Sequence, residues 1–179
     1  TPLSSQEVAQ GYKTVKERSA IARFKVVGED AYFLAWTTTP WTLPSNVALC
    51  VNPDETYCKV KAADGYTYYM AEALLEKTMQ MGGIENYEIL ANYPGAFFEN
   101  MLASHPFLDK TSRLVYAEYV TMDSGTGCVH TAPGFGADDY QTCRRYGMEM
   151  VVPVDDQGRH TDYAGKYAGL KTEESNPVI

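Results

Sequence analysis

Residues 21–46 read IARFKVVGEDAYFLAWTTTPWTLPSN, and this stretch decides the fold. Its first half contains two strand-like segments, 21–27 and 31–37, on either side of a Gly-Glu-Asp turn, which predicts a β-hairpin. Its second half cannot continue as a central strand, because Pro40 and Pro44 have no backbone N–H and bias the residues before them toward extended geometry. The sequence therefore predicts a hairpin that runs into a shaped loop rich in hydroxyl groups.

Short apolar segments separated by turn residues continue along the chain. The Asp-Gly pair at 64–65 indicates a second hairpin, so we expect the sheet to grow antiparallel. An irregular stretch is expected between 91 and 113. The further strand-like segments are 47–51, 56–61, 66–70, 87–91, 113–120, 128–131 and 150–154.

Two segments have the pattern of short amphipathic helices. In 71–81 the apolar residues fall on one helical face and Gly-Gly follows as a stop signal. In 138–146 acidic residues occupy the first turn and two arginines the last, which suits the helix dipole. Many short strands with only two helices indicate a mainly β fold of the α+β kind, either a barrel or a strongly bent sheet.

Length and composition narrow the class of protein. At 179 residues we expect a single domain, 1–179, with a sizeable core. No stretch approaches the roughly 20 apolar residues of a membrane span, and the N-terminus lacks the order of a signal peptide, so we expect a soluble, cytoplasmic protein with no membrane partner. The net charge of −8 argues against a protein that binds a nucleic-acid duplex along its phosphates. We therefore expect any contact with a nucleic acid to be confined to a small site.

The spacing of cysteines and histidines does not favour a metal site or a disulfide framework. The four cysteines have no CxxC spacing, and reduced, mostly buried thiols are expected. The histidines are far apart and the acidic residues lack ligand spacing, so we expect no metal. The residues concerned are Cys50, Cys58, Cys128, Cys143, His105, His130 and His160.

Two segments are too rich in polar and backbone-shaping residues to be simple connections. Segment 36–46 holds an indole, several hydroxyls and an amide, although threonines also favour strands and Ser and Asn favour turns. Segment 123–139 has glycines that let backbone N–H groups face a ligand, around His130 and Asp139. Taken alone, His130 is explained somewhat better as a hydrogen-bonded core histidine, and Asp139 as an acidic residue that stabilises the helix dipole.

A family resemblance decides between these interpretations. TTTPWTLP at 37–44 with Asn46, followed by GTG-x-VH-x-APG-x-G-x-DD at 125–139, resembles the editing insertion of isoleucyl-tRNA synthetases. The match covers nearly the whole chain, including His-Pro-Phe at 105–107. The related synthetases for valine and leucine carry Arg where this chain has Thr39, which favours the isoleucine type.

The resemblance implies a β-barrel editing domain that hydrolyses mischarged valyl-tRNA(Ile), with valyl adenylate as a further candidate substrate. Asp139 is expected to pair with the α-ammonium group, and His130 to shape and orient the pocket. The implied catalytic residues are Asp139, His130 and Thr38. The implied substrate-binding residues are Thr37, Thr38, Thr39, Trp41, Asn46, Gly125, Thr126, His130 and Asp139.

The resemblance also sets the expected partners. They are the 3′ end of mischarged tRNA(Ile), its valine moiety, and the rest of the synthetase chain, to which residues 1–18 and 168–179 would connect. The sequence lacks the signatures that activate amino acids in this family, so ATP and Mg are expected only in the missing catalytic domain and no cofactor in this one. We expect the isolated domain to be monomeric.

Two other functions remain open from the residues alone. The first is a non-catalytic module that binds an amino acid or a tRNA 3′ end in the same pocket. The second is a conventional hydrolase that uses Ser124 or Cys128 with His130 and Asp139, although no nucleophile elbow is recognisable around them.

Overall fold

The computed structural model describes residues 18–179, and its centre is a closed β-barrel. The strands follow one another in the order β1-β7-β8-β3-β9-β2, and pairing of β1 with β2 closes the ring. These strands are β1 (Ala20–Val26), β2 (Tyr32–Thr37), β3 (Ala48–Val51), β7 (Leu102–Ser104), β8 (Thr111–Tyr116) and β9 (Cys128–Thr131). The expected barrel and mainly β class are therefore confirmed.

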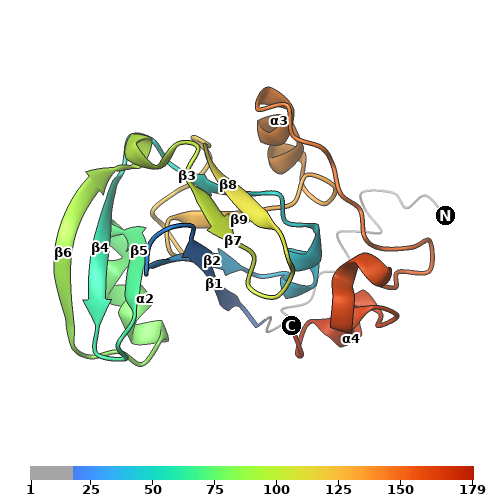
Figure 1. Ribbon diagram of the computed structural model, residues 1–179, viewed down its shortest axis with the longest axis horizontal. Helices are drawn as coiled ribbons and strands as arrows, with labels where there is room; N and C mark the ends of the chain where they lie inside the picture. Colours follow the sequence, from blue (N-terminus) through green and yellow to red (C-terminus); the bar gives the residue numbers. More distant parts are fainter. Residues whose placement is uncertain (1–17) are drawn as a thin grey trace, which may run out of the picture.

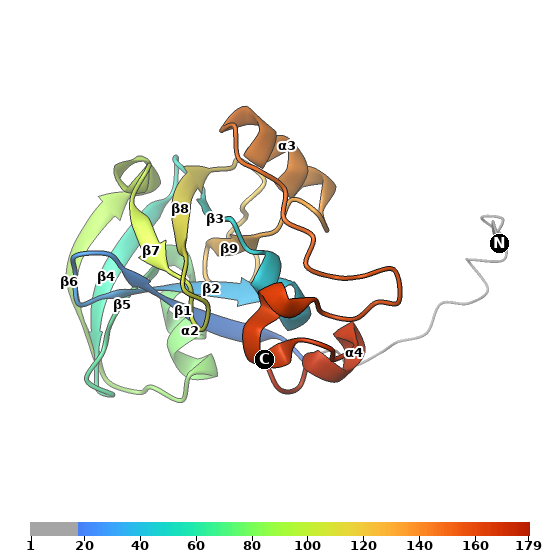
Figure 2. The ribbon, with the colours of Figure 1, turned by 45° about the vertical axis from the view of Figure 1, so that its right-hand side comes forward.

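A three-stranded extension continues the sheet from β2. It consists of β5 (Thr67–Ala71), β4 (Thr56–Ala62) and β6 (Tyr87–Pro94), in that order outward. The helix α2 (Leu75–Met81) packs on this extension, after a short 3-10 turn η2 (Glu72–Leu74). In Figures 1 and 2 the extension lies on one side of the barrel, and the C-terminal segment lies on the other.

The expectation of an antiparallel sheet is correct for six of the nine strand pairings in the described part of the chain and wrong for the other three. β1 pairs antiparallel with β2, and β4 with β5. β2 runs parallel to both β5 and β9, and β3 runs parallel to β8. The chain leaves the barrel after β3 to build the extension before it returns, and such long crossovers allow parallel neighbours.

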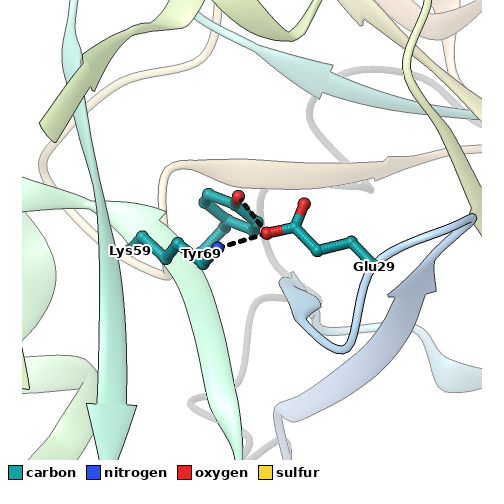
Figure 3. A network of polar contacts seen from close by, with 3 residues as sticks. All are labelled: Glu29, Lys59 and Tyr69. Carbon is teal, nitrogen blue, oxygen red and sulfur yellow. Dashed lines mark hydrogen bonds and ion pairs between the residues drawn. The ribbon is translucent and has the colours of Figure 1, made fainter. Parts of the chain in front are cut away.

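The turn between β1 and β2 is attached to the extension by a polar network (Figure 3). Glu29 Oε1 accepts a hydrogen bond from Tyr69 Oη at 2.8 Å and forms a salt bridge with Lys59 Nζ. Burial opposes ionisation of Glu29, but the hydrogen bonds from Lys59 and Tyr69 outweigh it and lower the pKa of the carboxyl group. The network therefore joins barrel and extension through one carboxylate.

The predicted segment boundaries hold for most elements, with three exceptions. The strand predicted at 113–120 ends at Tyr116, because 117–120 form a turn closed by Val120 N donating to Ala117 O. The strand predicted at 150–154 is absent from the described fold, where Val154 makes only an isolated bridge with His160. Pro153 has no N–H for a ladder there. The strand β7 lies within the stretch expected to be irregular.

The helices outside the extension are short. They are η1 (Pro40–Ser45), η3 (Gly95–Phe98), α3 (Ala137–Arg145), η4 (Asp162–Tyr167) and α4 (Thr172–Ser175). α3 confirms the helix predicted at 138–146, and η1 is the shaped loop expected around the two prolines. The predicted connection at 1–18 lies outside the described residues except for Arg18, while 168–179 is folded and includes α4.

The barrel interior is apolar and tightly filled. Its fully buried side chains include Phe24, Phe33, Leu49, Leu114 and Cys128. All four cysteines are buried and free, as expected. Among the described residues, none of the helices combines the length and the apolar character of a membrane span.

Candidate functional site

One end of the barrel carries the second half of segment 36–46 and the part of segment 123–139 that follows β9. β2 and β9 run parallel, with Trp36 opposite Val129, so the chain leaves both strands at the same end. After β2 it forms η1, and after β9 it forms the loop 132–136 that leads into α3. Trp41 of η1 meets Phe135 edge to face with ring centroids 4.9 Å apart. The two segments, distant in sequence, therefore adjoin in space.

His130 lies at the centre of a buried hydrogen-bond chain. Its Nδ1 is 2.7 Å from Asn46 Nδ2, and its Nε2 is 2.7 Å from Thr42 Oγ1. Asn46 Oδ1 accepts a hydrogen bond from the hydroxyl of Ser112 on β8. Thr42 Oγ1 donates to Thr39 O at 2.8 Å. The chain of bonds therefore links β8, η1 and β9.

The partners in this chain fix the tautomer of His130. Asn46 Nδ2 also donates to Ala48 O at 2.9 Å, which identifies it as the amide nitrogen, so Nδ1 of the imidazole must accept. Nε2 then carries the hydrogen and donates it to Thr42. Burial, followed by the charges of His105 and Lys110, lowers the pKa of His130 to about 3. His130 is thus neutral near pH 7, with both ring nitrogens bonded to protein groups.

The turn between β7 and β8 holds η1 from the other side. His105 Nε2 donates to Leu43 O at 2.8 Å, because its Nδ1 accepts from Phe107 N and Leu108 N. Lys110 Nζ donates to Pro44 O at 2.9 Å and to Asn46 O at 2.6 Å. The last carbonyl groups of a helix have no donors within it, so these side chains supply hydrogen bonds at the C-terminal end of η1.

Burial of these two side chains shifts their titration. It lowers the pKa of His105 to about 4 and that of Lys110 to about 8. His105 is therefore a neutral donor at pH 7, whereas Lys110 still carries its charge. The Lys110 ammonium group lies at the C-terminal end of η1, and the partial negative charge of the carbonyl groups there stabilises its positive charge.

The exposed side of η1 borders a cavity of about 550 Å³. Thr38 and Thr39 are exposed, whereas Thr37 is buried and its Oγ1 accepts from Thr39 N at 3.1 Å. The C-terminal segment closes one wall of the cavity, because Asn176 Oδ1 accepts from Trp41 N at 3.0 Å. The lining residues are Arg18, Thr38, Thr39, Pro40, Trp41, Asn176 and Pro177.

Asp139 belongs to a second hydrogen-bond network, beside the loop 132–136. Its Oδ2 accepts from Ala132 N and its Oδ1 from Tyr119 Oη, both at 3.0 Å. Burial raises the pKa of Asp139, while these two hydrogen bonds act in the opposite direction. The carboxyl group is half-buried. It accepts from protein donors at both oxygens and lies outside the group of residues that line the cavity at Thr38.

The structure therefore places the predicted site residues in three groups. The first group supports η1 from its buried side and consists of His130, Asn46 and the buried Thr37. The second forms the exposed side and consists of Thr38, Thr39 and Trp41. Asp139 is held separately in the first turn of α3, beside the loop 132–136. The contact between Trp41 and Phe135 connects the exposed side of η1 to that loop.

Gly125 and Thr126 have a supporting position. Gly125 has a φ of +77°, and a Cβ there would lie 3.1 Å from the Trp36 side chain. Thr126 is buried, and its hydroxyl donates to Leu34 O. Both residues support strand β2. The hydroxyl of Thr126 is used within the fold, and the substrate contact expected for Thr126 stays a prediction.

Ser124 and Cys128, the alternative nucleophiles, do not resemble an activated nucleophile. Cys128 is fully buried in the barrel core, and that burial raises the pKa of its thiol. Ser124 lies in an exposed turn. Both nitrogens of His130 are bonded to Thr42 and Asn46, so His130 is not placed to act as their base.

Several residues that position the site carry no recognisable signal in the sequence. Their roles depend on pairing between strands that are distant in sequence. One of them lies within the recognised motif 37–44, where no role was assigned to it, and the others lie outside both segments. These residues are Thr42, His105, Lys110, Ser112 and Tyr119.

The chain is similar to known proteins in family, sequence and fold. A family model described as "Leucyl-tRNA synthetase, editing domain" matches residues 16–176. An isoleucine–tRNA ligase of Kosmotoga olearia is 47% identical over 180 residues, which cover 100% of this chain and 19% of that protein. One of Desulfotalea psychrophila is 50% identical over 154 residues, which cover 86% of this chain and 16% of that protein.

Solved structures show the same fold. The P. falciparum cytosolic leucyl-tRNA synthetase editing domain matches with a TM-score of 0.61 and 14% identity, over 87% of this chain and 71% of that chain. At this identity the likeness shows the fold alone. This chain spans about a fifth of the length of the curated relatives it matches, since the Kosmotoga olearia protein is covered to 19%.

Proposed function

The chain belongs to the family of aminoacyl-tRNA synthetase editing domains, and from this premise we propose that it hydrolyses the ester of mischarged valyl-tRNA(Ile). The similarity to isoleucine–tRNA ligases supports the choice of tRNA. The observation that carries the proposal is the meeting of η1 with the loop 132–136, which leads into the helix α3 that bears Asp139, at the end where β2 and β9 both finish.

The need for such a reaction follows from the chemistry of the two amino acids. Valine and isoleucine differ by one methylene group, which a hydrophobic pocket discriminates by only about 1–3 kcal/mol; isoleucyl-tRNA synthetase is itself the best-known example of this limit. A second site that admits valine and excludes isoleucine by steric contact removes the remaining errors. The exposed Thr38 and Thr39, immediately before η1, offer a small, polar wall for this purpose.

The proposed role of each residue is consistent with its protonation state and its exposure in the fold. Asp139 pairs with the α-ammonium group of the valyl ester through a charge-assisted hydrogen bond. Thr38 and Thr39 contact the aminoacyl moiety beside Trp41. His130 acts as a positioning residue, because its neutral ring holds Thr42 and Asn46 in place and has no nitrogen left for proton transfer.

Hydrolysis of an activated ester requires less than hydrolysis of an amide. Placement of the carbonyl and of a water molecule, with donors for the developing oxyanion, supplies much of the rate enhancement without a covalent nucleophile. The tRNA and the rest of the synthetase are the expected partners. Because this chain has a net charge of −8, it does not attract the tRNA phosphates, and the rest of the synthetase would supply most of the tRNA-binding contacts.

A deacylation assay tests this function. We expect the chain to release valine from valyl-tRNA(Ile) and to spare isoleucyl-tRNA(Ile). The Asp139→Ala variant should lose the reaction, while Asp138→Ala, which removes an exposed neighbouring carboxylate, should keep it. Binding of the 3′ end without release of valine would instead identify a non-catalytic binding module.

A further inference from the structure

Tyr119 lies beside the Asp139 carboxyl group, although it comes from a different part of the chain. It belongs to the turn that follows β8, and its ring packs in the apolar cluster that includes Val115 and Val120. Its hydroxyl is 3.0 Å from Asp139 Oδ1 and 3.5 Å from Cys50 Sγ. The hydroxyl therefore lies between a carboxylate and a buried thiol.

The single hydrogen of the hydroxyl is directed to the carboxylate. A charged oxygen is a much stronger acceptor than a thiol sulfur. Cys50 Sγ already accepts from Thr131 Oγ1 at 2.9 Å. Burial raises the pKa of Tyr119, so the phenol keeps its proton at all ordinary pH values. Tyr119 is therefore a fixed donor to Asp139.

Two donors on two oxygens define the plane of the Asp139 carboxylate. Ala132 N holds Oδ2 and Tyr119 Oη holds Oδ1, each at 3.0 Å. A carboxylate can accept about four hydrogen bonds, so each oxygen keeps capacity for a ligand. With Ala132 alone the group would be free to turn about its Cβ–Cγ bond.

We propose that Tyr119 is a positioning residue for hydrolysis, which fixes Asp139 so that its free acceptor sites point toward the α-ammonium group of the aminoacyl ester. This inference rests on the proposed function, since it gives Asp139 the same ligand. It adds a residue from outside both sequence motifs to the site.

The surroundings of Asp139 make the bond measurable. Loss of the Tyr119 hydroxyl removes a hydrogen bond that lowers the pKa of Asp139, so the pKa rises further above its ordinary value. The other titratable or charged groups around it do not change. They are Asp138, Cys143 and Arg145 on α3, and Cys50 on β3.

The test compares Tyr119→Phe with Tyr146→Phe in deacylation of valyl-tRNA(Ile). Tyr146 is a matched control, because its hydroxyl contacts Tyr116 N at 3.1 Å and Glu99 at 3.3 Å, away from Asp139. Tyr119→Phe should lower kcat/KM by about ten- to a hundredfold, as expected for a misplaced reacting group. It should also move the acid limb of the pH–rate profile to higher pH, and Tyr146→Phe should change neither.

The outcomes separate this inference from the proposed function. If Asp139→Ala abolishes the reaction while Tyr119→Phe keeps both the rate and the acid limb of the unaltered chain, only the role of Tyr119 is overturned. A lower rate with an unmoved acid limb also overturns it, since that pattern indicates a loss of packing. If the unaltered chain releases no valine, the proposed function itself fails.

Discussion

The 2.7 Å hydrogen bond from His130 Nε2 to Thr42 Oγ1 joins two segments that are 88 residues apart in sequence. His130 stands on β9 and Thr42 on η1, so the bond ties the strand to the loop that follows β2. The same ring accepts from Asn46 at the other end of η1. One neutral imidazole thereby sets the shape of the loop that carries the exposed threonines.

The first prediction concerns His130→Ala. Removal of the ring leaves the buried amide of Asn46 and hydroxyl of Thr42 short of a partner, which should cost about 1–3 kcal/mol of unfolding free energy. The loosened η1 should accept a larger side chain, so that isoleucyl-tRNA(Ile) begins to be hydrolysed. Chemical denaturation and the ratio of the two deacylation rates measure these effects.

A control for this variant is Tyr57→Phe. It removes a buried hydroxyl that bonds Asn52 N at 2.9 Å, at the opposite end of β3 from Asn46. It should destabilise the fold without changing the ratio of rates. A His130→Ala protein that still spares isoleucine would show that His130 does not maintain the steric wall.

A second prediction follows from the neutral histidines. Burial lowers the pKa of His105 to about 4, lowers that of His130 to about 3, and also lowers that of His160. The unfolded chain binds protons on these residues near pH 6.5 and the folded chain does not, so stability falls as the pH drops below about 6.5. Each buried histidine contributes up to about 1.4 kcal/mol per pH unit.

Urea unfolding between pH 7.5 and pH 4.5 measures this loss. His105→Gln, which keeps a neutral donor toward Leu43 O, should flatten the dependence on pH. Constant stability down to pH 5 would contradict the assignment of neutral, buried rings.

A third prediction concerns the network of Glu29 shown in Figure 3. The folded-state pKa of Glu29 is lowered, so its contribution is present above the unfolded pKa and is lost as the pH falls through the folded value. Glu29→Gln should therefore cost about 1 kcal/mol at pH 7, and the difference should vanish in acid. The group is partly exposed, which limits the effect.

Thermal unfolding at pH 7 and at about pH 3 checks this expectation. Asp30→Asn serves as the control, because the Asp30 side chain is 96% exposed and 4.0 Å from Lys25. Equal stability of Glu29→Gln and the unaltered chain at pH 7 would show that the network does not hold the extension to the barrel.

The sequence was sufficient for features that local chemistry determines. The hairpin of 21–37, the break at Pro40 and Pro44, and the helix after the glycine-rich segment all depend on neighbouring residues, and the structure confirms them. The parallel pairing of β2 with β9 depends on contacts about 90 residues apart, such as Trp36 with Val129, which periodicity does not encode.

The site shows the same division. The motif residues were identified together, but the structure assigns them different positions: His130 is enclosed by Thr42 and Asn46, while Asp139 faces Tyr119. Which residues surround His130 depends on the register of β9 with β3, where Leu49 lies opposite His130. That register is a tertiary property, and a motif cannot reveal it.

The most direct test of the central claim is whether one ligand touches both segments at once. We would titrate the ¹⁵N-labelled chain with an amide-linked, non-hydrolysable analogue of 3′-valyl adenosine. We expect the backbone signals of Thr38 and Thr39 to shift together with those of Ala132 and Asp139, with a single Kd, and the isoleucyl analogue to bind more weakly. Shifts confined to only one of the two segments would contradict this expectation.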